Sequence, residues 1–471
     1  MAERKTKIIA TLGPSTADPQ TIMHLVDAGM DVARLNFSHG SKDVHAQTFA
    51  WVRAAAEKHN RPVAILQDIQ GPKIRVGTFP DGQIELAPGH TVSLVSGAGM
   101  GDADTISIGY LESVKGISAG DPVYLVDGRI ALVVEQTAPV IKARVLQGGV
   151  VCDRQGAAFP DGVFDVPAIT EKDAEDLVFG AELGVDYVAA SFVAKASDIR
   201  LVKEYNPDAR VIAKLERAVA YKALAEIIDE AHGVMVARGD LGVEMSFEVL
   251  PRVQKEIIDA TNAQGKISIT ATEMLESMRT ATRPTRAEVS DVANAVFDGT
   301  DAVMLSSETA VGDHPVEAVR VMHRICVEAE MAHVRSVGED FMAHEYPIAS
   351  ALTKAAAEVA DNLGIETIVV FTSSGRTARL ISKYRPKARV AAITTEASVY
   401  HRLALFHGVV PKLLDRDYPT ADEMDLAASR LLEKEGLVKQ GDTVLLVAGV
   451  PRGSRTNVIR VLQVGSEFLR E

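Results

Sequence analysis

From residue 5 to about residue 330 the chain alternates short apolar runs with longer amphipathic segments. The runs are too uniformly apolar for half-exposed strands, which indicates strands covered on both faces by helices. The segments between them carry helix-start signals, such as Thr170 followed by Asp173. Eight such runs favour a closed (β/α)8 barrel over a large open sheet. The expected strands are Lys7–Leu12, Asp31–Asn36, Val63–Asp68, Tyr187–Ser191, Arg210–Lys214, Gly233–Ala237, Ile267–Ala271 and Ala302–Leu305.

Roughly 100 residues separate the third expected strand from the helix that begins near Thr170. A connection of that length must have its own structure, and this one is rich in Gly, Pro, Asp and alternating β patterns. We therefore predict a small β domain inserted from about Gly71 to Pro167. Its expected strands include Ile84–Leu86, Thr91–Val95, Pro122–Val126 and Val140–Leu146.

After about Ala343 the apolar runs start again. Runs such as Thr367–Phe371 and Thr443–Val447 alternate with helices such as Ala349–Leu363 and Ala421–Glu435. Two further strands are expected, over Arg389–Ile393 and Val409–Leu414. This pattern predicts an open α/β sheet. The whole chain is thus expected to be α/β: a TIM barrel over 1–70 and 168–342, a β-barrel lid over 71–167, and a C-terminal α/β regulatory domain over 343–471.

Composition narrows the class of protein. The 471 residues are 47% hydrophobic and 24% charged, which is ordinary for a globular chain. Two cysteines are too few for a secreted disulfide framework or a zinc ribbon, so a reduced cytoplasm is expected. A formal net charge of −14 argues against non-specific nucleic-acid or anionic-membrane binding. No apolar run approaches the ~20 residues of a membrane span, and the one near the N-terminus is too short for a secretion signal.

Polar residues collect where the expected strands end, which is where barrel enzymes carry their chemistry. Helix caps would explain a few of them, but not the whole set. They are Arg34, Asn36, Ser38, Asp68, Lys214, Glu216, Arg238, Gly239, Asp240, Thr272, Glu273 and Ser306 to Glu308.

Glu216 and Asp240 are carboxylates on adjacent strand ends, an arrangement suited to a hard divalent cation. Lys214, two residues before Glu216, projects to the same side of an extended strand. It is a candidate Schiff-base nucleophile, acid/base or electrostatic support for a moving phosphoryl group. Arg34 offers a planar fork for phosphate, and Gly239 lets backbone amides approach an anion. These features indicate a phosphorylated carboxylic acid as the substrate, with phosphoryl transfer or enolate chemistry.

Eight segments in order resemble the pyruvate kinase family, and together they span most of the chain. The family combines a barrel, a β-rich lid after the third strand and a C-terminal α/β domain. The segments are Thr6–Ser15 (TKIIATLGPS), Gly29–Gly40 (GMDVARLNFSHG), Asp68–Arg75 (DIQGPKIR), Ile212–Glu216 (IAKLE), Met235–Gly242 (MVARGDLG), Ile269–Met278 (ITATEMLESM), Arg283–Ala295 (RPTRAEVSDVANA) and Met304–Ala310 (MLSSETA).

The resemblance implies phosphoryl transfer from phosphoenolpyruvate to ADP, giving pyruvate and ATP. It assigns Mg²⁺ or Mn²⁺ to Glu216 and Asp240, and support of the departing phosphoryl group to Lys214. Arg34 would bind the phosphate. The substrate carboxylate would be bound by the backbone at Gly239 and Asp240 and by Thr272, which also lies in the region implicated in protonating the enolate.

The resemblance also assigns a monovalent-cation site to Asn36, Ser38, Asp68 and the carbonyl of Ile69. In potassium-dependent members the position of Lys73 is typically glutamate, and the positions of Ile69, Gln70 and Val76 also differ here. A lysine ammonium is itself a monovalent cation on a flexible stem. We therefore expect Lys73 to replace K⁺, so that K⁺ is not required. The plain alternative is that Lys73 points to solvent at the lid hinge.

Nucleotide contacts are implied for Arg75 and for the loop Asn36–His39. Where many members carry two lysines before a glycine in the lid, this chain has Arg154, Gln155 and Gly156. Arg154 keeps a positive charge at the first position only, and it is either a nucleotide contact or a solvated loop cation. Asp127–Gly128 is either a lid turn or an active-site contact.

A hydroxyl-rich turn precedes an expected helix near Ala378 in the C-terminal region. Backbone amides at a helix N-terminus, with hydroxyls and an arginine, form an anion site, although a plain helix cap is the alternative. By resemblance, a sugar phosphate or nucleoside monophosphate would bind here as an allosteric effector of a homotetramer. The residues are Thr372, Ser373, Ser374, Gly375, Arg376 and Thr377, with Arg452 and Arg455 on the loop Gly449–Asn457.

Two other functions remain open from the residues. A barrel lyase or aldolase would use Lys214 as a Schiff base, but it leaves Arg34 and the two carboxylates without roles. A catalytically silent metabolite sensor would have no need for the intact set of Lys214, Glu216, Asp240 and Thr272.

Overall fold

The computed structural model describes residues 4–164, 166–332, 347–416, 421–449 and 455–465. Eight parallel strands close into a barrel in the order β1-β18-β17-β16-β15-β14-β3-β2. Nearly every residue of these strands is buried, because the barrel interior covers one face and helices the other. The strands are β1 (Lys7–Leu12), β2 (Val32–Asn36), β3 (Ala64–Asp68), β14 (Tyr187–Ala190), β15 (Val211–Leu215), β16 (Gly233–Ala237), β17 (Ile267–Ala271) and β18 (Ala302–Leu305).

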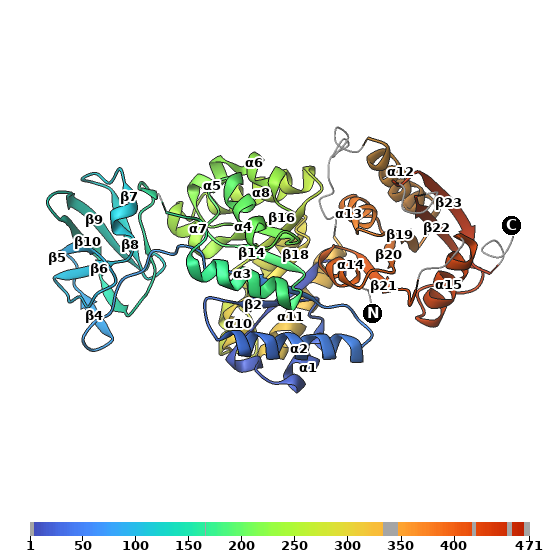
Figure 1. Cartoon of the computed structure of the whole chain (residues 1–471), viewed down its shortest axis with the longest axis horizontal. Helices are drawn as coiled ribbons and strands as arrows, with labels where there is room; N and C mark the ends of the chain where they lie inside the picture. Colours follow the sequence, from blue (N-terminus) through green and yellow to red (C-terminus); the bar gives the residue numbers. More distant parts are fainter. Residues whose placement is uncertain (1–3, 165, 333–346, 417–420, 450–454, 466–471) are drawn as a thin grey trace.

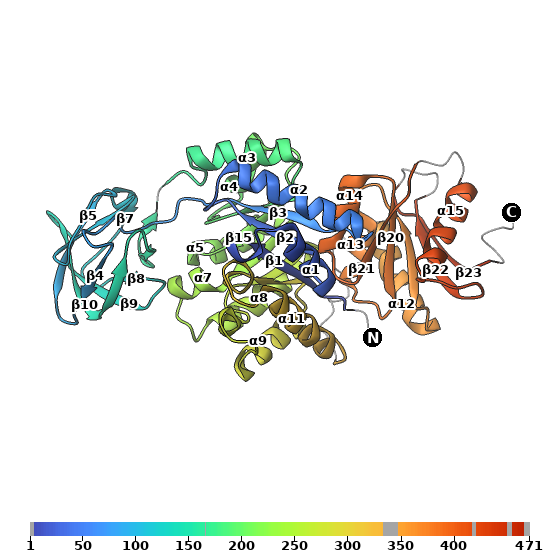
Figure 2. The same ribbon diagram turned by 90° about the horizontal axis from the view of Figure 1, so that it is seen from below.

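Helices surround the barrel (Figures 1 and 2). The predicted start at Thr170 is confirmed: its hydroxyl accepts the backbone N–H of Asp173, and the Asp173 carboxylate accepts the N–H of Thr170. The helices are α1 (Pro19–Ala28), α2 (Lys42–Lys58), α3 (Glu171–Leu183), α4 (Ala196–Tyr205), α5 (Ala218–Lys222), α6 (Leu224–Glu230), α7 (Arg238–Glu244), α8 (Leu250–Ala263), α9 (Arg286–Phe297), α10 (Ser307–Ala310) and α11 (Pro315–Glu330), with 3-10 turns at Pro14–Thr16 and Glu276–Arg279.

The segment between β3 and α3 forms a separate β structure beyond the carboxyl ends of the barrel strands (Figure 1). One sheet has the order β12-β8-β9-β10-β5-β6, and two further pairs are β11-β4 and β13-β7. Their inward residues form a hydrophobic core of their own. The strands are β4 (Gln83–Leu86), β5 (Thr91–Ser96), β6 (Thr105–Ile108), β7 (Val114–Lys115), β8 (Pro122–Leu125), β9 (Ile130–Gln136), β10 (Ile141–Gln147), β11 (Gly149–Cys152), β12 (Ala157–Ala158) and β13 (Val163–Phe164), with a 3-10 turn at Leu111–Ser113. We call this segment the lid.

The C-terminal region is an open five-stranded sheet with the order β21-β20-β19-β22-β23. Four of its strands are parallel, whereas β23 pairs with β22 in the antiparallel sense. The elements are α12 (Pro347–Leu363), β19 (Thr367–Phe371), α13 (Arg376–Lys383), β20 (Arg389–Thr394), α14 (Ala397–Arg402), a 3-10 turn at Leu403–Leu405, β21 (Val409–Leu413), α15 (Ala421–Lys434), β22 (Thr443–Ala448) and β23 (Val458–Gln463).

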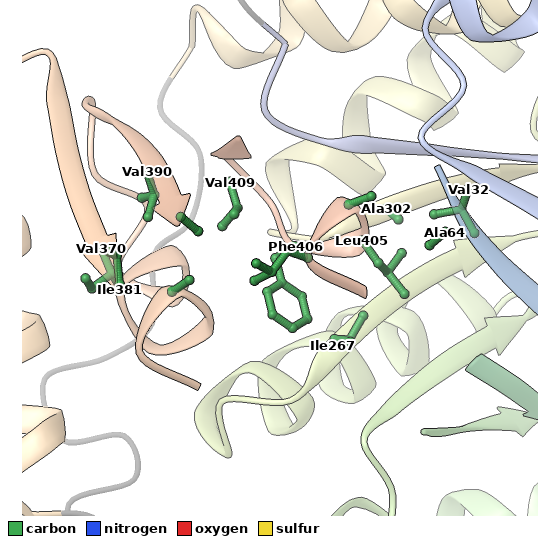
Figure 3. Close-up of a cluster of buried hydrophobic side chains, with 14 of the residues drawn as sticks. Val32, Ala64, Ile267, Ala302, Val370, Ile381, Val390, Leu405, Phe406 and Val409 are labelled. Atoms are coloured by element: carbon green, nitrogen blue, oxygen red, sulfur yellow. The ribbon is translucent and has the colours of Figure 1, made fainter. Parts of the chain in front are cut away.

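The C-terminal region packs against the amino end of the barrel, opposite the lid (Figures 1 and 2). One buried cluster runs from the barrel interior into the C-terminal sheet. Leu405 and Phe406 lie between barrel residues such as Ala302 and sheet residues such as Val390 (Figure 3). The barrel is therefore closed at its amino end by an apolar plug, while its carboxyl end faces the lid.

The eight predicted barrel strands agree with the structure to within one residue at each end. The helix expected near Ala378 begins earlier, at Arg376, because Gly375 adopts a φ of 81° and serves as the N-cap. β23 was not predicted. No helix among the described ranges has the length and hydropathy needed to cross a membrane.

Candidate active site

The structure brings the polar strand ends together at the carboxyl end of the barrel. Parallel strands end at the same rim, so residues distant in sequence become neighbours. Register pairs Asn36 of β2 with Asp68 of β3, and Lys214 of β15 with Met235 of β16. Glu216 follows β15, Gly239 and Asp240 lie in α7 directly after β16, and Thr272 follows β17.

Lys214 is the centre of this cluster. Its Nζ donates to Ser191 Oγ at 2.7 Å and to Asp68 Oδ1 at 3.2 Å, and it lies 2.8 Å from Glu216 Oε1. Burial alone would lower the pKa of Lys214, but the carboxylates of Asp68 and Glu216 raise it above the ordinary value. The ammonium therefore stays protonated, the opposite of what a Schiff-base nucleophile requires.

Arg34 and Lys214 share the carboxylate of Asp68. Arg34 Nε lies 2.7 Å from Asp68 Oδ2, and its Nη1 donates to Thr11 Oγ1 at 2.9 Å. Burial would raise the pKa of Asp68, but the two cations lower it below its ordinary value. Two positive charges are thus held in place at the rim by one ionised carboxylate.

Glu216 and Asp240 form the candidate metal site. Burial raises the pKa of Glu216, Lys214 opposes the rise, and the nearby charge of Asp240 adds to it. The Oε2 atom of Glu216 accepts the backbone N–H of Phe192 at 2.6 Å. Two carboxylates that disfavour each other's charge fit a hard divalent cation, which would relieve that repulsion. No set of three or more Asp, Glu, His or Cys side chains in the described ranges converges as a metal site.

Gly239 and Thr272 meet at the start of α7. The backbone N–H of Gly239 donates to Thr272 Oγ1 at 2.8 Å, and this hydroxyl donates to the carbonyl of Ala271 at 2.7 Å. Thr272 has a φ of 68°. The threonine hydroxyl is thereby oriented beside the first amides of the helix.

The predicted monovalent-cation residues lie on β2, on β3 and just after them. Asn36 Oδ1 accepts the N–H of Ser38 at 3.2 Å, and the carbonyl of Ile69 accepts the hydroxyl of Ser191 at 2.7 Å. Lys73 is placed differently from the expectation. Its Nζ lies 2.7 Å from Asp240 Oδ1, at the candidate metal site, and 5.9 Å from the centre of the Phe192 ring.

The predicted nucleotide residues connect the barrel rim to the lid. Arg75 Nη1 donates to the carbonyl of Arg154 at 2.9 Å, and the Arg154 side chain is exposed. A cavity of about 50 Å³ lies between lid and barrel. Asp127, Glu216 and Glu244 are among its lining residues, and burial raises the pKa of Glu244 to about 7.

The predicted effector turn lies at the N-terminus of α13. Thr372 Oγ1 accepts the N–H of Gly375 at 2.9 Å, and the hydroxyls of Thr377 and Thr456 are 2.7 Å apart. The second contact brings the loop after β22 next to the turn. Arg455 belongs to that loop, whereas Arg452 lies outside the described residues.

Two residues of the site had no assigned role in the sequence analysis. Ser191 follows β14 and accepts a hydrogen bond from Lys214, so its position at a strand end was the available signal. Arg238 was noted only as one of the strand-end residues, and its side chain turns back onto the carbonyls of Ala271 and Thr272. No sequence pattern indicates that direction.

A phosphotransferase fits this site, because clustered cations and paired carboxylates suit a transferring phosphoryl group. The family model "Pyruvate kinase, barrel domain" matches residues 3–319, and "Pyruvate kinase, alpha/beta domain" matches residues 350–462. The pyruvate kinase of Geobacillus stearothermophilus is 43% identical over 98% of this chain and 80% of its own length. That of Thermococcus litoralis is 41% identical over 98% and 99%, and human pyruvate kinase PKLR is 41% identical over 98% and 86%. The chain belongs to the pyruvate kinase family.

Proposed function

We propose that this enzyme transfers the phosphoryl group of phosphoenolpyruvate to ADP at the rim cluster. The phosphorus–oxygen bond to the enolate oxygen breaks, phosphorus bonds to a β-phosphate oxygen of ADP, and the enolate takes a proton at C3 to give pyruvate. The observation that carries the proposal is the Lys214 side chain, buried between Asp68, Ser191 and Glu216. A fixed ammonium in a water-poor site stabilises the charge that develops as the phosphoryl group moves.

Around Lys214 each side chain has a separate task. Arg34 binds the phosphoryl oxygens with a planar guanidinium oriented by Asp68 and Thr11. The amides at Gly239 and Asp240, with the hydroxyl of Thr272, bind the carboxylate at the start of α7. For this the Thr272 hydroxyl turns its proton from the Ala271 carbonyl, and the Gly239 N–H turns from Thr272 Oγ1, toward the substrate. Thr272 also lies on the path by which C3 is protonated.

Glu216 and Asp240 would hold Mg²⁺ or Mn²⁺, which neutralises substrate oxygens and polarises the enolate oxygen. Asn36, Arg75 and Arg154 would contact the nucleotide, and Asn36 also belongs to the proposed monovalent pocket with Ser38, Asp68 and Ile69. We further propose that Lys73 makes K⁺ unnecessary. Its ammonium lies within 2.7 Å of Asp240, so one positive charge stands beside the metal site without a bound monovalent ion.

We propose that a phosphorylated metabolite binds Thr372 to Thr377 together with Arg455 and Arg452, and favours the active state of a homotetramer. The contact between Thr377 and Thr456 supports a two-sided anion site. We place the enzyme in the cytoplasm, consistent with two free cysteines. The proposed domain limits are 1–70 with 168–342, 71–167, and 343–471.

A coupled lactate dehydrogenase assay tests the reaction. NADH oxidation is expected only when phosphoenolpyruvate, ADP and Mg²⁺ are all present. Absence of pyruvate formation, or the same rate without ADP, would contradict the proposal.

The effector site needs a second experiment, in which phosphorylated sugars and nucleoside monophosphates are titrated at subsaturating phosphoenolpyruvate. The expected shift in half-saturation is lost in Arg376→Ala and kept in Arg430→Ala, a matched change on α15. If no compound shifts the half-saturation, or Arg376→Ala keeps the shift, the effector site is wrong.

A further inference from the structure

Two consecutive residues after β17 have strained backbones. Thr272 has a φ of 68° and Glu273 a φ of 51°. This left-handed region is unfavourable for side chains other than glycine, and most of all for a β-branched residue such as threonine. Such a conformation is unfavourable and persists only where the surrounding structure holds it. Contacts with other residues must therefore stabilise the backbone of Thr272 and Glu273.

The side chain of Arg238 supplies the contacts that do so. Its Nη2 donates to the carbonyl of Thr272 at 2.7 Å, and its Nε donates to the carbonyl of Ala271 at 3.2 Å. The third nitrogen, Nη1, lies 2.6 Å from Asp291 Oδ1 on α9. Because the guanidinium is planar and its donors have fixed directions, Asp291 sets the orientation in which the fork meets the two carbonyls. The Arg238 side chain is only 10% exposed, so water competes little for these bonds.

Arg238 and the Thr272 hydroxyl also act on the same turn from two sides. The residue after Arg238 is Gly239, whose N–H donates to Thr272 Oγ1. The guanidinium thus holds the threonine backbone while the neighbouring amide orients its hydroxyl. Farther along, Glu308 accepts the N–H groups of Leu275 and Ser306, at 3.0 and 2.7 Å. The segment after the turn is therefore anchored separately, and the turn itself is held by Arg238 together with the Gly239 amide.

We propose that Arg238, oriented by Asp291, is a positioning residue that holds Thr272 in its strained backbone conformation and so aims the threonine hydroxyl at the substrate. The proposal rests on the role proposed above for Thr272 in binding the carboxylate and protonating C3. Arg238 does not touch the reacting atoms. Lysine has a single nitrogen and cannot span both carbonyls and Asp291, so Arg238→Lys keeps the charge and loses the fork.

The test separates proton transfer from phosphoryl transfer. With Mg²⁺ and ATP bound in D₂O, the proton on C3 of pyruvate passes by way of the Thr272 hydroxyl to solvent, the C–H electrons form the C2–C3 double bond, and the carbonyl oxygen takes the negative charge. A deuteron from solvent is added to C3 on return. Exchange is followed by NMR, together with the KM for phosphoenolpyruvate. Since a misplacement of about 1 Å can cost ~10²-fold, Arg238→Lys is expected to slow exchange by about 10- to 100-fold and raise KM by about tenfold.

The matched control is Arg53→Lys. Arg53 likewise joins a carbonyl, that of Val63, to a carboxylate, that of Asp186, but at the amino end of the barrel. It should lower thermal stability as Arg238→Lys does while leaving exchange unchanged. Asp291→Asn, which keeps an acceptor, should give an intermediate loss of exchange. In the double variant Thr272→Ala with Arg238→Lys, the second change should add little, because both act through one hydroxyl.

Each contrary result has one meaning. Normal exchange in Arg238→Lys, with Thr272→Ala impaired, overturns the positioning role and leaves the role of Thr272 intact. A loss in Arg238→Lys that adds in full to that of Thr272→Ala also overturns it, because Arg238 would then act elsewhere. Normal exchange in Thr272→Ala overturns the role of Thr272 itself, and the inference with it.

Discussion

The two ends of the barrel use the same residue types for opposite purposes. At the amino end three aspartates each directly precede a strand, and each carboxylate accepts a backbone N–H from a neighbouring strand, which joins the strands at their starts. The acceptor and donor pairs are Asp31 with Ile8 at 2.8 Å, Asp186 with Ile65 at 2.7 Å, and Asp301 with Ser268 at 2.9 Å. All three carboxylates are buried beneath the C-terminal region or the helices.

At both ends burial raises the pKa of a carboxyl group, and the charges of neighbouring side chains oppose or add to that rise. Asp31 faces Arg4 and Arg61, and Asp301 faces Lys383 and Arg385; the pKa of each aspartate lies below its ordinary value despite burial. The same holds for Asp68 at the carboxyl end, with its two cations. The pKa values of Asp186 and Glu216 are raised, because burial outweighs the effect of Arg53 and Arg402 on Asp186 and of Lys214 on Glu216.

The two ends of the barrel differ in how far the chain covers their charged side chains. At the amino end the chain itself covers the charges, and the Lys383 side chain is 1% exposed. At the carboxyl end Asp240 stands beside Glu216, and its side chain is 30% exposed to the cleft under the lid. The closed end therefore serves stability, whereas the open end leaves the carboxylate of Asp240 accessible beside Glu216, where the proposed divalent cation would add positive charge.

The largest effect is expected from Lys214→Met at the open end. Turnover should fall by on the order of 10³-fold, while phosphoenolpyruvate binding stays largely intact, because the ammonium matters most as the phosphoryl group departs. Steady-state kinetics and equilibrium binding give the two values. Lys203→Met, which removes a lysine paired with Glu230 away from the rim, is the matched control. Near-normal turnover in Lys214→Met would contradict the proposed role of Lys214 in phosphoryl transfer.

Asp301→Asn at the closed end should lower stability and leave turnover nearly unchanged. It leaves Lys383 and Arg385 buried without their carboxylate, so the free energy of unfolding should fall by about 3 kcal/mol or more. Turnover of the folded enzyme should stay within about twofold. Denaturant unfolding measures the loss, and Glu256→Gln, which breaks an exposed pair with Arg252, should cost less than about 1 kcal/mol. An equal loss in the two variants contradicts the comparison.

Glu244, in the cleft, makes the open end sensitive to pH. Its folded-state pKa of about 7 exceeds the ordinary 4.5, so the folded protein binds this proton more tightly. The contribution to stability is complete below pH 4.5 and is lost as the pH rises through 7. Without divalent metal, Glu244→Gln should therefore gain about 3 kcal/mol over wild type at pH 8 and almost nothing at pH 4.5. Melting temperatures of both proteins between pH 4.5 and 8 test this expectation. Parallel plots of melting temperature against pH would contradict the raised pKa of Glu244.

The smallest effect concerns Lys73. In tetramethylammonium buffer the wild type should be active, and added K⁺ should change its rate little. Lys73→Glu should require K⁺, with activation of about tenfold, corresponding to about 1.4 kcal/mol from one charge beside the site. Lys73→Gln, which removes the charge without adding a negative one, should lie between them. Strong K⁺ activation of the wild type refutes the proposed replacement.

The sequence predicted the barrel well because its strands are buried on both faces and separated by helices with clear start signals. It did not predict β23, whose Arg460 and Val461 are exposed and whose pattern is neither alternating nor continuously apolar. The strand ends identified the rim residues, because parallel strands converge there. The contact of Lys73 with Asp240 joins residues 167 apart, and no local pattern indicates it.

One matched pair of substitutions tests the division between the two ends most directly. Glu216→Gln and Asp31→Asn make the same carboxylate-to-amide change, at the open and the closed end. Glu216→Gln should lose at least about 10²-fold in turnover with an unchanged or higher unfolding midpoint, since burial and Asp240 already disfavour its charge. Asp31→Asn should keep its turnover and lose about 3 kcal/mol of stability, because Arg4 and Arg61 lose their shared partner. If both variants lose turnover, or both lose stability, to the same extent, the two ends do not have separate tasks and the account is wrong.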